Sequence, residues 1–170
     1  PRRAENESGL LPVPAWEMNY HWQGRQPESD LPSLYDPPEG YLASANESLD
    51  RADELLIHCH GLPAYRKWRI AQRLHELHQA TVEDMQALQY DVTSLQAQLL
   101  LPVFLPHMPA GPLRELLTEW DCRYTVDSHA ATMFQHLYKH VLLEVFGHKE
   151  GIGWRRMFYL CTRLGYSSMV

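Results

Sequence analysis

The chain has 170 residues, 45% hydrophobic and 21% charged, which is the balance of a globular protein with a core of useful size. Its formal net charge of −6 argues against nucleic-acid binding, because no basic patch is present to release phosphate counterions. The longest apolar run, residues 99–105, contains Pro102 and is far shorter than the roughly 20 residues of a membrane span. We therefore expect neither a nucleic-acid partner nor a membrane segment, and no signal peptide is visible.

Residues 1 to about 40 are rich in proline, glycine and aromatic residues and have no sustained periodicity. This composition predicts an extended arm with turns rather than regular elements. Aromatic surface of this extent needs a covering, so we expect the arm to lie against the helical half or a partner chain. The side chains concerned are Trp16, Tyr20, Trp22 and Tyr35.

The segment 37–46, PPEGYLASAN, predicts a turn at Gly40 followed by a short strand from Tyr41 that ends near Asn46. A strand end fixes a side chain while the next loop leaves it reachable. An asparagine amide donates two N–H groups without titrating, so it can stabilise negative charge on an oxygen. Two alternatives for Asn46 stay open, a turn role and a glycosylation sequon.

From Asp50 onward the apolar spacing is helical. Thr81 with Asp84 resembles a capping box, Pro102 is expected to stop the helix that follows, and Asp127 or Ser128 is expected to cap a long helix. We predict a mainly α chain, with an extended arm and short strand over 1–49 and a helical region over 50–170. The expected helices cover about residues 50–59, 65–79, 81–101, 113–120, 128–146 and 154–164.

Three cysteines without CxxC spacing, Cys59, Cys122 and Cys161, predict free thiols rather than a zinc site. Ten histidines include two pairs expected on helix faces, His75 with His78 and His136 with His140. Either pair offers two metal ligands, but zinc needs a third and fourth, so no zinc site is predicted. The segment 58–60, His-Cys-His, likewise offers too few ligands for a zinc site.

An ordered series of short motifs runs along most of the chain. The series consists of GLLPVPAW at 9–16, WQG at 22–24, YRKWRI at 65–70, EDM at 83–85, QYD at 89–91 with Ser94, and Trp120-Asp121. It resembles the penicillin acylase (penicillin amidase) family of N-terminal-nucleophile hydrolases, which also contains cephalosporin and acyl-homoserine-lactone acylases. The resemblance extends from about Gly9 to about Phe146 and implies a piece of a larger αββα fold.

The resemblance implies an amidohydrolase that cleaves a small-molecule acyl-amide through an acyl-enzyme. In the family the nucleophile, usually serine, becomes the first residue of a chain when the proenzyme cleaves itself, and its α-amine serves as the base. That serine is expected upstream of Gly9, and Pro1 has no hydroxyl, so we expect this chain alone to be inactive. The implied partners are the remaining parts of the acylase α and β chains, and the implied location is periplasmic or secreted.

Site residues follow position by position from the resemblance. Asn46 matches the asparagine that completes the oxyanion hole, although Glu47 stands where the family has a second asparagine. Arg66 matches the arginine that supports the active site. Asp91 is expected to be a hydrogen-bonding hub rather than a catalytic group. Many family members carry calcium, for which Gly9 and Asp53 are the nearest candidates.

Two alternative functions belong to other classes of protein than the acylases. A stand-alone helical interaction module would bury its tryptophans without a partner, whereas a piece of a larger acylase would leave them exposed. A catalyst that uses the amine of Pro1 as a general base would lose activity when that amine is blocked.

Overall fold

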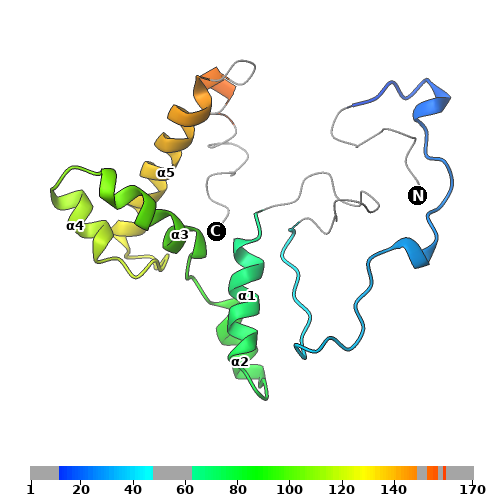
Figure 1. Ribbon diagram of the computed structural model, residues 1–170, viewed down its shortest axis with the longest axis horizontal. Coiled ribbons are helices and arrows are strands. Elements are labelled where there is room, and N and C mark those ends of the chain that lie inside the picture. Colours follow the sequence, from blue (N-terminus) through cyan, green and yellow to red (C-terminus); the bar gives the residue numbers. More distant parts are fainter. Residues whose placement is uncertain (1–11, 48–62, 149–152, 157–158, 160–170) are drawn as a thin grey trace. The chain divides into compact units, whose positions relative to one another are not determined.

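The computed structural model describes residues 12–47, 63–148, 153–156 and 159 (Figure 1). The chain divides into two compact units, Pro1–Ala64 and Tyr65–Val170, and each is described by itself. Helices form most of the regular structure in the described residues, as the sequence predicted. The predicted boundary between residues 49 and 50 and the predicted helix at 50–59 lie outside the described residues.

The first unit is an extended arm interrupted by two short 3₁₀ turns, η1 (Met18–Tyr20) and η2 (Glu28–Asp30). Proline and glycine account for this irregular path, and Gly40 adopts a φ of +74° in the predicted turn. The predicted strand from Tyr41 is not formed within the described residues, where 41–44 have no regular structure. A strand requires a neighbour for its backbone hydrogen bonds, and among the described residues of this unit only Glu47, just past Asn46, takes part in a β-bridge.

The second unit begins with α1 (Tyr65–His75), which is shorter than predicted and ends before His78. The predicted His75–His78 pair is therefore wrong, because only His75 lies in the helix. On α1, Trp68 is 52% exposed. The next helix, α2 (Val82–Gln89), begins with the predicted capping box, in which Thr81 and Asp84 each accept a backbone N–H of the other.

The single helix expected up to Pro102 is instead two helices, α2 and α3 (Leu95–Phe104). Asp91 accepts the backbone N–H of Thr93, and Ser94 caps α3 by accepting the N–H of Ala97, so the chain turns between the two. Pro102 lies inside α3 and does not stop it. The proline removes one hydrogen bond to the carbonyl of Gln98, a residue exposed to water that can replace it.

Three further elements complete the described part of this unit: η3 (Leu105–His107), α4 (Pro112–Thr118) and α5 (His129–Gly147). Ser128 caps α5 by accepting the N–H of Ala131, as predicted. Among the large apolar residues of α5, Phe134 is buried, whereas Met133 and Val145 are exposed. Residues 153–156 are helical, within the helix predicted from Trp154.

The core of the second unit lies where α3, α4 and α5 meet. Phe134 is fully buried, and its ring contacts the rings of Phe104, Trp120 and Tyr138 at centroid distances of 5.5 to 6.4 Å. Such aromatic contacts add stabilisation beyond the area they bury. The other buried members of this cluster are Ala97, Leu101, Leu117, Cys122 and Ala130.

Two short extended segments join this core to the turn before α3. Ser94 donates its N–H to the carbonyl of Cys122, and Tyr124 donates to the carbonyl of Val92, both at 2.9 Å. These bonds surround an antiparallel bridge between Thr93 and Arg123. The segment after α2 is thereby held at both ends, which fixes the position of Asp91.

Candidate functional site

Asn46 lies in the first unit in a left-handed backbone conformation, with a φ of +64°. Asparagine tolerates this conformation better than most residues, which explains its use at this turn. The residue is exposed, while the neighbouring Glu47 is buried and accepts the N–H of Ala45 at 2.7 Å. The carboxylate that departs from the family pattern is thus folded back onto the backbone.

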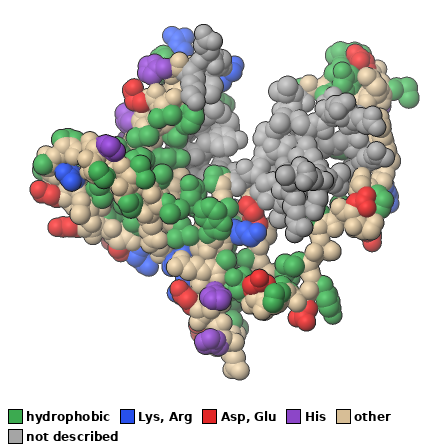
Figure 2. Space-filling view, in the orientation of Figure 1, with side chains coloured by type: hydrophobic (Ala, Val, Ile, Leu, Met, Phe, Trp, Pro, Cys, Tyr) green, Lys and Arg blue, Asp and Glu red, His purple; other side chains and the backbone are tan. Residues whose placement is uncertain are grey.

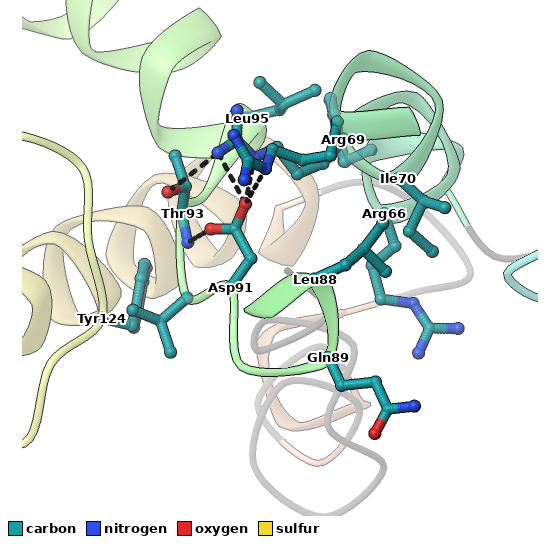
Figure 3. Close-up of a pocket in the computed structure, with 12 residues that line it drawn as sticks. Arg66, Arg69, Ile70, Leu88, Gln89, Asp91, Thr93, Leu95 and Tyr124 are labelled. Carbon is teal, nitrogen blue, oxygen red and sulfur yellow. Dashed lines mark hydrogen bonds and ion pairs between the residues drawn. The ribbon is translucent and has the colours of Figure 1, made fainter. Parts of the chain in front are cut away.

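The second unit contains a pocket of about 430 Å³ between α1, the end of α2 and the start of α3. Figure 3 shows its polar centre, where the guanidinium of Arg69 faces the carboxylate of Asp91. Apolar side chains make up much of the remaining wall. The lining residues are Tyr65, Arg66, Arg69, Ile70, Arg73, Leu88, Gln89, Asp91, Val92, Thr93, Leu95 and Tyr124.

Asp91 is the hydrogen-bonding hub that the sequence predicted. Its Oδ2 accepts from Nε of Arg69 at 2.7 Å and lies 2.6 Å from Nη2, while Oδ1 accepts the N–H of Thr93 at 2.9 Å. Arg73 adds a more distant cation, with Nε 3.8 Å from Oδ2. Burial alone would raise the pKa of Asp91, but the hydrogen bonds from Thr93 and Arg69 together with the charge of Arg69 outweigh it and lower the pKa.

Arg69, which sequence reasoning passed over in favour of Arg66, holds this hub. Arg66 lines the same pocket, but its side chain points away from Asp91 in Figure 3. The signal was present in the sequence, since Tyr65, Arg69 and Arg73 recur every four residues and so share one face of α1. Whether Arg66 supports catalysis stays a prediction.

Tyr124 brings a phenol to the pocket from the segment before α5. Its hydroxyl accepts a hydrogen bond from Nε2 of Gln135 at 2.7 Å, which anchors the ring against α5. Burial raises the pKa of Tyr124 to about 12, although the Gln135 hydrogen bond acts in the opposite direction. The phenol therefore stays protonated at neutral pH and can serve as a neutral hydrogen-bonding group.

Within residues 12–47, 63–148, 153–156 and 159, no group of three or more His, Cys, Asp or Glu side chains is placed to hold a metal ion. The calcium candidates Gly9 and Asp53 lie outside this range, as do Cys59, Cys161 and the His58–His60 segment. Cys122 is a free, buried thiol, as predicted. None of the helices in the described residues has the length and apolar content to cross a membrane.

Comparison with known proteins places the motifs in one family. The sequence profile named penicillin amidase matches residues 1–166, nearly the whole chain. The chain belongs to the penicillin amidase family. It is 35% identical over 136 residues to the penicillin acylase 2 proenzyme of a Pseudomonas species, an alignment that covers 75% of this chain and 17% of that protein.

Acylases of a second kind align with the same chain. The acyl-homoserine lactone acylase QuiP of Pseudomonas fluorescens is 32% identical over 123 residues, covering 69% of this chain and 14% of that protein. The protein of the same name from Pseudomonas aeruginosa is 25% identical over 197 residues, covering 99% of this chain and 22% of that protein. The chain thus spans about a fifth or less of the length of these relatives.

Proposed function

We propose that this chain forms part of an acylase that hydrolyses an acyl-amide bond through an acyl-enzyme, and that Asn46 is its oxyanion-hole donor. The observation that carries the proposal is the family match over residues 1–166. The exposed position of Asn46 is compatible with the role, because an oxyanion donor must reach a substrate. The proposed substrate is an acyl-amide of the penicillin, cephalosporin or acyl-homoserine-lactone type.

In this reaction the nucleophile attacks the amide carbonyl, and negative charge develops on the carbonyl oxygen. The side-chain amide of Asn46 donates an N–H to that oxygen and stays neutral at every pH, so its contribution does not depend on a titration. The amine then leaves, and water releases the acyl group from the enzyme. The nucleophile belongs to a part of the acylase outside these residues, and Arg66 supports the site from α1.

The exposed apolar surface supports a role within a larger protein. Trp16, Trp22, Trp68 and Trp154 are exposed by 84%, 62%, 52% and 59%, as expected for a piece of an acylase and not for a stand-alone module. Exposed apolar residues also lie on the outer face of α3, namely Leu99, Pro102 and Val103, and Pro106 follows in η3. An exposed apolar helix face is normally covered by a partner, so the remaining acylase chains are the proposed covering.

The test compares two substitutions at Asn46 in the assembled acylase, with a chromogenic amide as substrate. Asn46→Gly retains a residue suited to a φ of +64°, whereas Asn46→Ala does not, and both remove the amide. Both variants should lose about 10²–10³-fold in kcat, with the stability of the glycine variant unchanged. Wild-type turnover in either variant would contradict the role of Asn46, and turnover by the 170-residue chain alone would contradict its proposed inactivity.

The second candidate is a helical interaction module without chemistry. The closed core around Phe134 favours it, because a unit with its own buried cluster can fold without a partner. Isolation of this chain from its native source as a stable monomer, with no amidase activity in any associated fraction, would favour the module over the acylase.

The proposal also includes a calcium site and a cellular location for the acylase. Gly9 and Asp53 are the calcium candidates, and removal of calcium with a chelator should lower the melting temperature of an acylase that holds the ion there. An unchanged melting temperature would remove these two residues from the proposal.

A periplasmic or secreted location is proposed from the family alone and is tested by fractionation of the source cells.

A further inference from the structure

Four histidines lie on the described part of α5 and its end: His129, His136, His140 and His148. All four are exposed, and Figure 2 shows histidine side chains on the surface of the region that contains this helix. His136 and His140 are one turn apart on one face, at a spacing where Cβ atoms are about 5–6 Å from each other. Imidazole rings at this spacing can converge on a single ion.

A hydrogen bond to the backbone holds the ring of His140. Its Nδ1 lies 2.7 Å from the backbone carbonyl oxygen of His136. Because a carbonyl oxygen only accepts, Nδ1 must carry the hydrogen, and in the neutral ring the lone pair is then on Nε2. Histidine ligands of metals commonly donate one ring N–H to a backbone carbonyl in this way, which fixes both the tautomer and the ring orientation.

One acidic side chain, Glu144, lies on the same face of α5 as the pair, and Lys139 lies between the two histidines in the sequence. Among the described residues, no acidic side chain forms an ion pair with either ring, so both stay available. Glu144 follows His140 by one further turn, a spacing that sequence reasoning overlooked, and its carboxylate lies 3.4 Å from Nε2 of His148. This carboxylate adds negative charge along the same face.

We propose that His136 and His140 form a two-histidine site for a divalent transition-metal ion of the copper, nickel or zinc class. Two imidazoles with water in the remaining positions make an exchangeable site rather than a closed structural one. Affinity should follow the order of the metals, with Cu²⁺ bound more tightly than Ni²⁺ or Zn²⁺. Binding would link two successive turns of α5 and stabilise the helix, whether or not the chain acts in an acylase.

The experiment titrates the histidine-labelled 170-residue chain with Cu²⁺ and follows the imidazole NMR signals, which the paramagnetic ion broadens locally. The signals of His136 and His140 should broaden together and first, and a chelator should restore them. In His136→Ala the selective broadening of His140 should disappear, because the single remaining imidazole cannot chelate the Cu²⁺ ion. Glu144→Gln should weaken binding less than His136→Ala does.

Two matched controls keep the test specific. His129→Ala removes an exposed histidine from the same helix, and His75→Ala removes one of the pair that the structure separates. Neither change should alter the broadening of His136 and His140. Earlier broadening of other histidines, or broadening of His140 that is unaffected by His136→Ala, would overturn the proposal.

Discussion

Arg69 and Asp91 are joined by an ion pair in which Nη2 and Nε of the arginine lie 2.6 and 2.7 Å from the same carboxylate oxygen. Their side chains are only 20% and 9% exposed, so water screens this pair less than a surface pair. The pair ties α1 to the turn that precedes α3. It is therefore the contact that shapes the pocket of the second unit.

Loss of this pair should destabilise the second unit. Asp91→Ala leaves the Nε–H of Arg69 and the N–H of Thr93 without their acceptor, and we expect a loss of about 1–3 kcal/mol in unfolding free energy. Urea unfolding followed by circular dichroism measures this change. Arg114→Ala removes an exposed arginine of α4 as the control and should change stability by less than about 0.5 kcal/mol. Equal losses in the two variants would contradict a stabilising role of the Arg69–Asp91 pair.

The same pair predicts a dependence of stability on acid. The pKa of Asp91 is lower in the folded protein than its ordinary value of 3.8, so its stabilising contribution is fully present above that value. The contribution is lost as the pH falls below 3.8 through the folded pKa. In Asp91→Asn the acid limb of stability should be flatter than in the wild type. Superimposable acid limbs would show that Asp91 does not carry the effect.

The thiol of Cys122 should react slowly in the folded protein. Its pKa is raised, first by burial and then by the charge of Asp121, and the reactive thiolate is therefore disfavoured. Alkylation at neutral pH followed by peptide mapping should find Cys122 unmodified in buffer and modified in urea. Peptide mapping separates it from Cys59 and Cys161. Equal labelling in both conditions would contradict the buried position.

Gly147 at the end of α5 should not tolerate a side chain. A methyl group there would lie 3.2 Å from the Cα and Cβ atoms of Trp154, and one of these is backbone. Gly147→Ala should cost about 1–3 kcal/mol through this overlap, against a gain of at most about 1 kcal/mol in helix propensity. Thermal unfolding measures whether Gly147→Ala lowers or raises the stability of the protein. A stabilised variant would show that the overlap is relieved without cost.

Capping signals in the sequence were reliable because they depend on neighbouring residues alone. Thr81 with Asp84 and Ser128 mark real helix starts for this reason. The break between α2 and α3 was missed although Asp91 and Ser94 supply a local turn and cap there, and tertiary contacts of Arg69, Cys122 and Tyr124 also hold it. Local apolar spacing continued across the break and concealed it.

Some features of the candidate site were predicted from the sequence and others were not. Asp91 was identified as a hub from its motif, but its partner Arg69 lies 22 residues earlier, and the helical spacing of Arg69 does not by itself point to Asp91. The backbone conformation of Asn46 was also missed, because the strand expected before it needs a neighbour that a sequence pattern cannot supply.

The most direct test of the central claim is the intact mass and N-terminal sequence of the protein from its native source, together with any chain that co-purifies. We expect a longer chain that contains these residues and begins with Ser, Thr or Cys, as an acylase nucleophile requires. A native product that begins near Pro1 and has no partner chain would contradict the acylase proposal and leave the helical interaction module in its place.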